Sequence, residues 1–208
     1  PNKIINEKSH VAPLDFYAKQ KYLSERATGW LNRSPTIYRF GTLFGLSPRM
    51  RFDLVINLFV AQALTDGKIT VFGGKQERPF LHVSDAADSL IFGIEKNITG
   101  TYNVISENMT ILQAAERIKK IIGCEIEISA ENEDNRSYRV SAEKIKQVGF
   151  TPLKNLDDTI KEIKDAFSNK LLKDYNDVKY NNYKTLYSSK EVQKEVFIEG
   201  ISGSLNLP

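Results

Sequence analysis

The 208-residue chain is poor in the residues that form disulfides and transition-metal sites. It has one cysteine, Cys124, and two histidines, His10 and His82. A single cysteine excludes an internal disulfide and suits a reducing compartment, so we expect a cytoplasmic location. With so few sulfur and nitrogen ligands a zinc site is not expected, and the site residues predicted below include no metal ligand.

The chain also lacks long apolar runs and concentrated charge of one sign. No apolar stretch approaches the roughly 18 residues of a transmembrane helix, and residues 1–9 are polar, without the apolar core of a signal peptide. The formal net charge is only +3, with lysines and arginines spread along the sequence. Because no basic stripe with interleaved aromatics occurs, we expect neither a nucleic acid nor a membrane as a partner.

A third absence is the glycine-rich turn that binds dinucleotides. Among the 12 glycines, neither Gly-x-Gly-x-x-Gly nor Gly-x-x-Gly-x-x-Gly occurs. Where this turn is present, it brings the backbone and a helix N-terminus to the pyrophosphate of the dinucleotide. The sequence therefore contains no segment that we expect to bind a pyrophosphate in this way.

The sequence that is present alternates predicted strands with predicted helices, which indicates an α/β fold. Helices are expected over residues 14–29, 53–66, 84–96, 111–122, 141–148 and 155–168. Strands are expected over residues 36–40, 69–73, 78–83, 101–105 and 125–129, with a glycine-bearing loop over 41–51. Asp53 and Thr110 are predicted N-caps, and Gly123 is predicted to end a helix. Residues 169–208, rich in lysine, asparagine and tyrosine, are predicted to form a polar tail or arm.

A tyrosine and a lysine four residues apart, Tyr17 and Lys21, fall on one face of the first predicted helix. An ammonium about 4 Å from a phenolate stabilises it by about 4 kcal/mol at an effective dielectric constant of about 20. The pair therefore suits a tyrosine that accepts a proton at neutral pH. The same spacing at Tyr175/Lys179 and Tyr180/Lys184 we interpret as an accident of composition. Spacing alone favours a solvated helix pair at Tyr17 as well.

The surroundings of Tyr17 favour the catalytic interpretation. Pro13 precedes the tyrosine by four residues and Glu25 follows the lysine by four. Further segments follow in order: 36–45 (TIYRFGTLFG), 71–85 (VFGGKQERPFLHVSD), 102–104 (YNV) and 134–152 (DNRSYRVSAEKIKQVGFTP). Together they resemble the extended short-chain dehydrogenases/reductases, the NAD-dependent nucleotide-sugar epimerase and dehydratase family. A narrower stretch over 47–57, SPRMRFDLVIN, resembles a branch that includes GDP-heptose 4-dehydrogenases.

The resemblance implies the C-terminal part of a Rossmann-type enzyme with a smaller α/β substrate domain. Residues 1–45 would form the edge of the Rossmann-type domain with its Tyr-x-x-x-Lys helix. Residues 46–168 would form mainly the substrate-binding domain with some returning Rossmann elements, and 169–208 the tail or arm. Because the glycine-rich turn is absent and only 16 residues precede Tyr17, we expect a fragment that alone binds the dinucleotide poorly and is inactive.

In this family a tyrosine abstracts a hydroxyl proton while a hydride leaves the sugar carbon for the nicotinamide. The resemblance gives that role to Tyr17 and places Lys21 beside the nicotinamide ribose. It implies NAD as the cofactor, with NADP as an alternative, and cofactor contacts from Phe40, Gly41 and Thr42. The implied function is hydride transfer at a sugar carbon, C4 first, of a nucleotide sugar, in an epimerase, dehydrogenase or dehydratase that forms a homodimer.

The resemblance also predicts substrate contacts. Arg78 and Arg136 would bind the diphosphate, because a planar guanidinium forms paired hydrogen bonds with phosphate oxygens. Surface salt bridges are the alternative for both arginines. Asn57 would bind the sugar or a phosphate, with an asparagine that faces solvent as the alternative. His82 follows apolar residues, so we expect a core or loop histidine rather than a base.

Two other functions stay open at this point. One is a reductase of 4-keto-sugar nucleotides that uses NAD(P)H and releases its cofactor at each turn. The other is a relative without catalytic activity that binds a nucleotide sugar or a partner protein. The intact Tyr17/Lys21 pair argues against this second alternative, because a binding protein does not need both residues.

Overall fold

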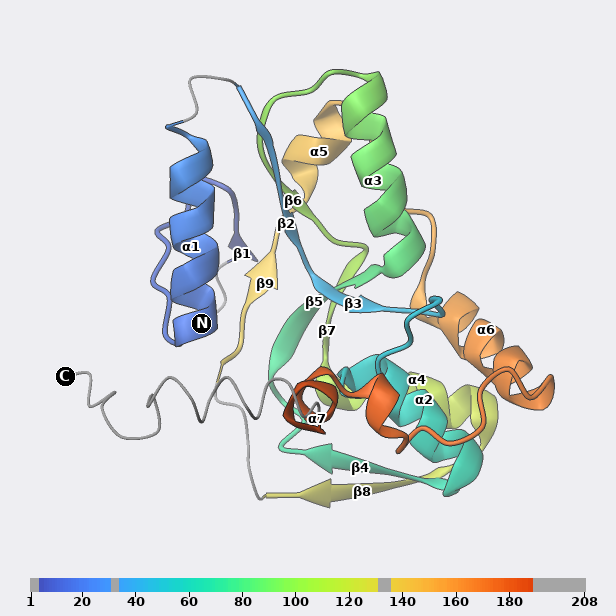
Figure 1. The fold of residues 1–208 in the computed structure, drawn as a ribbon. Coiled ribbons are helices and arrows are strands. Elements are labelled where there is room, and N and C mark those ends of the chain that lie inside the picture. The colour runs from blue at the N-terminus through green and yellow to red at the C-terminus, as the bar shows by residue number, and fades with distance from the viewer. Residues whose placement is uncertain (1–3, 31–33, 131–135, 189–208) are drawn as a thin grey trace.

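The computed structural model describes residues 4–30, 34–130 and 136–188, which form an α/β fold (Figure 1). The helices are α1 (Phe16–Thr28), α2 (Val55–Thr65), α3 (Val83–Glu95), α4 (Ile111–Ile122), α5 (Glu143–Gln147), α6 (Leu156–Ser168) and α7 (Asn182–Ser188), with a 3-10 turn at Val178–Tyr180. The strands are β1 (Ile4–Ile5), β2 (Thr36–Phe40), β3 (Thr42–Phe44), β4 (Lys68–Phe72), β5 (Glu77–His82), β6 (Gly100–Val104), β7 (Glu107–Thr110), β8 (Glu125–Ser129) and β9 (Arg139–Val140).

The ends of the helices test the predicted caps. The Thr110 side chain accepts a hydrogen bond from Gln113 N in a full capping box, and Gly123 ends α4 with φ of 84°, so both predictions for α4 are confirmed. The prediction that Asp53 caps α2 is wrong, because Leu54 stands at the N-cap without a side-chain hydrogen bond. The Asp53 carboxylate is instead occupied by the guanidinium of Arg51 at 2.8 and 2.9 Å.

The chain crosses between two sheets at Gly41. Before it, β2 pairs in parallel with β6, and after it, β3 pairs in parallel with β5. A β-carbon at Gly41 would lie 2.9 Å from the Pro79 carbonyl oxygen, so the crossing requires glycine. Neither β3, which lies within the loop predicted over 41–51, nor β7, which pairs antiparallel with β5, was predicted.

Two apolar cores lie on either side of this crossing. One gathers side chains around α2, α4 and α6, including Phe44, Ile56 and Ile160. The other joins β6, α3 and α5 and includes Leu81, Tyr102 and Ile145. The predicted boundaries between a Rossmann-type edge, a substrate-binding domain and a tail stay a prediction.

The first half of the predicted tail packs against the core around α2. Leu172 is buried, and Phe52 contacts the rings of Tyr175 and Tyr180 with centroids 6.1 and 5.2 Å apart. The backbone N–H of Phe52 donates to the Tyr180 carbonyl at 3.0 Å. Residues 189–208 of the predicted arm lie outside the described residues.

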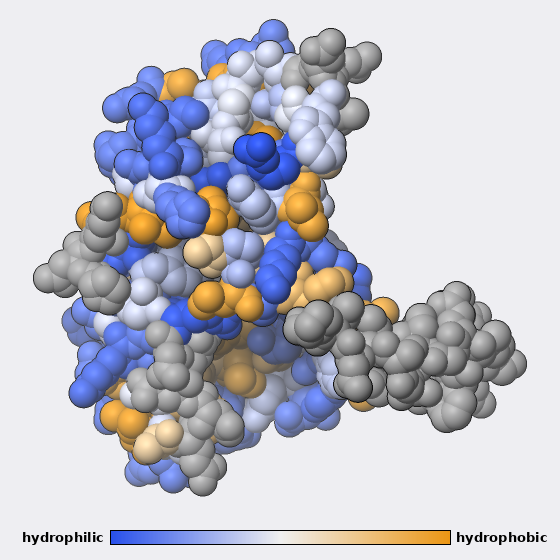
Figure 2. Space-filling view, turned by 90° about the vertical axis from the view of Figure 1, so that its left-hand side faces the viewer, coloured by the Kyte–Doolittle hydropathy of each residue, from blue (hydrophilic) through white to orange (hydrophobic). Residues whose placement is uncertain are grey.

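Helix α1 differs from the other long helices because none of its residues is buried. Leu14, Phe16, Leu23 and Trp30, on or beside it, are 64–79% exposed. The molecular face that carries α1 shows hydrophobic side chains scattered among hydrophilic ones (Figure 2). Within the described ranges, no helix combines the length and apolar character that crossing a membrane requires.

Gly93 of α3 gives a testable packing constraint on β2. A β-carbon there would lie 1.8 Å from the Tyr38 hydroxyl oxygen, which donates to the Ser89 carbonyl at 2.9 Å. Gly93→Ala is expected to lower the free energy of unfolding by about 1–3 kcal/mol, because the clash outweighs the helix propensity of alanine. Urea unfolding followed by circular dichroism measures the change. Tyr38→Phe in the same chain should recover part of it, and a Gly93→Ala chain of higher stability would contradict this packing.

Glu162 links α6 to β5 and to the segment before α6. Its carboxylate lies 3.0 Å from His82 Nε2 and accepts from Lys154 Nζ at 2.8 Å. Burial raises the pKa of Glu162, but Lys154 and His82 outweigh burial and hold it below the ordinary value of 4.5. A carboxylate with a depressed folded-state pKa contributes stability that is complete above the unfolded-state pKa. That contribution is lost as the pH falls through the folded-state pKa.

Glu162→Gln is therefore expected to destabilise the chain at pH 7 and to have a smaller effect at about pH 3, below the ordinary carboxyl range. Urea midpoints at the two pH values measure the difference. Glu143→Gln, which removes an exposed ion pair with Lys146, is the matched control and should change stability little at either pH. Equal losses for Glu162→Gln at both pH values would show that its charge does not contribute.

Candidate functional site

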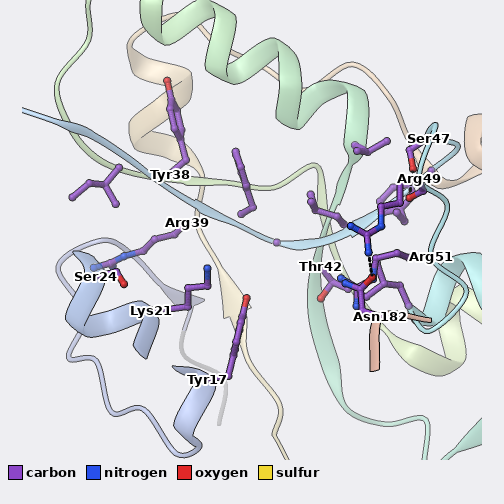
Figure 3. Close-up of a pocket in the computed structure, with 18 of the residues that line it drawn as sticks. Tyr17, Lys21, Ser24, Tyr38, Arg39, Thr42, Ser47, Arg49, Arg51 and Asn182 are labelled. Carbon is purple, nitrogen blue, oxygen red and sulfur yellow. Dashed lines mark hydrogen bonds between the residues drawn. The ribbon is translucent and has the colours of Figure 1, made fainter. Parts of the chain in front are cut away.

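A cleft of about 1230 Å³ lies between α1 and the loop that joins β3 to α2 (Figure 3). Residues of α1, β2, β3, this loop, α2 and the first turn of α7 line it. Tyr17 and Lys21 lie on one side, and Arg49, Arg51 and Asn182 lie on the other (Figure 3). The β2–β3 crossing runs between these two walls.

Tyr17 and Lys21 project from one face of α1, which begins after the N-cap Asp15, whose carboxylate accepts from Ala18 N at 2.7 Å. Tyr17 is 68% exposed, and Lys21 Nζ lies 5.5 Å from the centre of its ring. Both residues line the cleft. The sequence expectation of a shared helix face is met, while their catalytic role stays a prediction.

In the other two tyrosine–lysine pairs, Tyr175, Lys179 and Tyr180 form contacts that hold residues 172–182, here called the late segment, in place. The Tyr175 hydroxyl donates to Asp66 at 2.5 Å, and Lys179 pairs with Asp177 at 2.8 Å and lies over the Tyr180 ring. Of the three spacings, only Tyr17/Lys21 supplies residues to the cleft lining. The structure thus separates pairs that the sequence motif alone could not distinguish.

The predicted cofactor contacts Phe40, Gly41 and Thr42 form consecutive positions of the cleft lining at the sheet crossing. Gly41 N donates to the Val104 carbonyl at 3.0 Å, which fixes the backbone there. Gly41 itself is buried, and its missing β-carbon would meet the Pro79 carbonyl and the Ile105 side chain. The cofactor contacts of these three residues stay predictions.

Asn57 lines the cleft but is engaged within the protein. It is 3% exposed, its Oδ1 accepts from Gly45 N at 3.0 Å, and its Nδ2 donates to the Arg51 carbonyl at 3.0 Å. The alternative of an asparagine that faces solvent is therefore wrong. Gly45 has φ of 109°, and a β-carbon there would lie 2.3 Å from His82 Nε2. Asn57 thus binds the β3–α2 loop at two points, Gly45 and Arg51.

Two arginines of this loop were not predicted as site residues. The side-chain hydrogen bond with Asp53 raises the pKa of Arg51, and Tyr17 is close enough to act on the same guanidinium. Arg49 Nη2 donates to Asn182 Oδ1 at 3.2 Å. Two arginines close together in the SPRMR stretch could have indicated an anion-binding loop. The sequence did not show that both side chains line the cleft.

The described cleft lining has an excess of positive charge, although Arg51 and Arg136 also pair with Asp53 and Asp15 outside the lining. Five cationic side chains line it, against the single carboxylate of Glu25: Lys21, Arg39, Arg49, Arg51 and Arg136. A cleft lined by one sign of charge concentrates ions of the opposite sign. The lining therefore favours an anionic ligand.

The structure places the two predicted diphosphate ligands differently. Arg136 lines the cleft and forms an ion pair with Asp15 at 3.2 Å. Arg78 is 9% exposed, donates to the carbonyls of Glu77 and Arg136, and lies 5.4 Å from the centre of the Tyr138 ring. Arg78 is not part of the cleft lining, and its guanidinium is bound to the Arg136 carbonyl. Residues 131–135, before Arg136, lie outside the described residues, and phosphate contacts of both arginines stay predictions.

His82 is a core histidine in its contacts. It is 2% exposed, with Nδ1 2.7 Å from Ser84 Oγ and Nε2 3.0 Å from Glu162. Its side chain also accepts from Ser84 N at the start of α3. Its burial agrees with the expectation of a core histidine.

Curated relatives are similar to part of the chain. UDP-glucuronic acid decarboxylase 3 of Arabidopsis thaliana is 39% identical over 113 residues, which cover 50% of this chain and 33% of the relative. UDP-glucuronic acid decarboxylase 1 of Danio rerio is 29% identical over 141 residues, 65% of this chain and 34% of the relative. The chain thus matches about a third of the length of these relatives.

Solved structures share the fold. A dTDP-glucose 4,6-dehydratase of Bacillus anthracis in complex with NAD matches 80% of this chain and 58% of its own, with a TM-score of 0.69 and 22% identity. A UDP-glucose 4-epimerase of Thermus thermophilus in complex with NAD matches 80% of this chain and 58% of its own, with a TM-score of 0.64 and 20% identity. The sequence profile of the NAD dependent epimerase/dehydratase family matches residues 1–104, half of the 208 residues, and the chain belongs to that family.

Proposed function

We propose that the protein transfers a hydride between NAD and a sugar carbon, C4 first, of a nucleotide sugar, with Tyr17 as the proton acceptor. The observation that carries this proposal is the cleft itself. It sets the Tyr17/Lys21 face of α1 opposite a loop with two guanidinium groups, and its lining has five cations and one carboxylate. The names of the relatives and fold neighbours, which concern UDP- and dTDP-linked sugars, support the substrate class.

The described residues fit one end of NAD. Lys21 offers an ammonium to ribose hydroxyls at the cleft wall, and Phe40 and Thr42 also line the cleft. No glycine-rich turn for the pyrophosphate occurs in the 208 residues. When bound, NAD supplies the hydride acceptor.

The chain's own residues would divide the remaining work. Tyr17 accepts the proton of the sugar hydroxyl, and the Lys21 ammonium stabilises the phenolate. Arg136, Arg51 and Arg49 bind the diphosphate, since arginine forks pair with phosphate oxygens. Asn57 holds the loop that presents Arg51. The GDP-heptose branch, the use of NADP and a homodimer stay predictions. The choice among epimerase, dehydrogenase, dehydratase and 4-keto-sugar reductase also stays a prediction.

The test is an isotope experiment on the full-length protein. UDP-, dTDP- and GDP-glucose, each with protium or deuterium at C4, are supplied with NAD, and product formation is followed. A slower reaction of a deuterated sugar supports hydride transfer at C4. Equal rates for a sugar that does turn over would contradict it. NAD that stays bound through purification would favour an epimerase over a reductase that exchanges its cofactor at each turn.

A further inference from the structure

Helix α1 carries the proposed proton acceptor, yet it has little apolar packing against the described residues. None of its residues is buried, and Phe16 and Leu23 are 70% and 64% exposed. Ala18, Tyr22, Glu25 and Thr28 of α1 are half-buried, and its other residues are exposed. Among the described residues, polar contacts therefore contribute much to where the Tyr17 hydroxyl lies.

One side chain provides the strongest of these contacts. Arg39 of β2 donates through Nε and Nη2 to the two carboxylate oxygens of Glu25, at 2.9 and 2.5 Å. Its Nη1 donates to the Glu7 carbonyl at 3.4 Å. Glu7 Oε1 in turn accepts from the backbone N–H of Asn103, the residue paired with Arg39 across the parallel strands β2 and β6. Arg39 thus joins α1, the segment before α1, and the sheet.

Glu25 lies on the same helix face as the proposed catalytic pair. Tyr17, Lys21 and Glu25 are spaced by four residues each, so they form one stripe along α1, and all three line the cleft with Arg39. A fork-to-carboxylate contact fixes both distance and rotation, because it requires two parallel hydrogen bonds. Fixing Glu25 therefore fixes the direction in which Tyr17 points, two turns away.

We propose that Arg39 is a positioning residue, which sets the rotation of α1 on the sheet through Glu25 and so places the Tyr17 hydroxyl in the cleft. This inference rests on the proposed function of Tyr17. A second ion pair, between the N-cap Asp15 and Arg136, holds the start of α1 less firmly. Its side chains are 49% and 54% exposed, against 21% and 28% for Glu25 and Arg39, and exposed ion pairs contribute little.

The test compares Arg39→Gln, Arg39→Lys and Glu25→Gln in the full-length protein. Each is expected to lower kcat about tenfold, because a displaced catalytic group loses its aligned geometry, with KM changed less than kcat. Hydrogen exchange of the α1 amides, measured without ligand, should become faster in each variant. The double variant Arg39→Gln/Glu25→Gln should be no worse than either single one, since both remove the same contact.

Arg117 is the matched control. It also joins two carboxylates, Glu107 at 2.7 Å and Asp157 at 2.8 Å, with 35% of its side chain exposed, but it lies outside the cleft lining. Arg117→Gln should leave kcat and α1 exchange unchanged. The inference is overturned if Arg39→Gln leaves α1 exchange unchanged, or if Arg39→Gln lowers activity while Glu25→Gln does not, which would make Arg39 a ligand contact. Failure of the proposed function has a different signature, a Tyr17→Phe protein with full turnover.

Discussion

Replacing Tyr17 by phenylalanine is expected to lower turnover of the full-length protein by roughly 10²–10⁴-fold, the usual contribution of a positioned acid or base. The substitution removes only the hydroxyl, while the ring beside Lys21 remains. Affinity for the nucleotide sugar should stay within a few-fold, because the cationic lining that would bind the diphosphate is intact. Steady-state kinetics together with calorimetric titration of the substrate separate the two quantities.

Tyr175→Phe is the control for this experiment. It makes the same chemical change at a second tyrosine with a lysine four residues on, but Tyr175 bonds Asp66 and does not line the cleft. Turnover of Tyr175→Phe should match that of the unmodified protein. If the Tyr17→Phe protein also has normal turnover, another group accepts the proton and Tyr17 is not the base.

Arg136→Ala is expected to weaken the binding of UDP by about ten- to a hundredfold. A charge-assisted hydrogen bond contributes about 1.5–3 kcal/mol, and about 1.4 kcal/mol corresponds to a factor of ten. UDP alone is the probe, because it removes the sugar from the comparison. Arg136→Lys should recover only part of the loss, since lysine keeps the charge but not the planar fork.

Two neighbouring arginines sharpen the interpretation of this titration. Arg139 lies 3.6 Å from Glu77 and outside the cleft lining, so Arg139→Ala should leave UDP affinity nearly unchanged. Arg78→Ala should weaken UDP binding, because Arg78 supports the backbone of Arg136. Unchanged affinity in both Arg136→Ala and Arg78→Ala would remove most of the case for a nucleotide-sugar substrate.

Local signals in the sequence predicted much of this arrangement. The helix that holds Tyr17 and Lys21, the capping box at Thr110 and the left-handed Gly123 depend on residues within one or two turns of each other. Spacings of this kind can be read directly from a sequence. The alternation of strands and helices indicated the α/β fold, and the order of the motifs added the family.

Features that depend on distant partners were not predictable in the same way. Arg51 faces the cleft because Asn57 holds its carbonyl, and the backbone of the adjacent Phe52 is bound by Tyr180, 128 positions further along. The sequence does not distinguish Arg78 from Arg136, yet Arg78 is buried and bound to the Arg136 carbonyl, while Arg136 lines the cleft. Which arginines line the cleft therefore depends on contacts between residues that are distant in the sequence.

The packing of the late segment changes how natural variation in this protein should be interpreted. Asn182 bonds Arg49 in the cleft wall, and Tyr180 supports the loop from outside. The asparagine- and tyrosine-rich stretch resembles a low-complexity region in which substitutions are usually treated as neutral drift. Here Asn182 is part of the cleft wall and Tyr180 binds the backbone of Phe52 in the loop behind it, so substitutions at these two positions are expected to change the wall of the cleft.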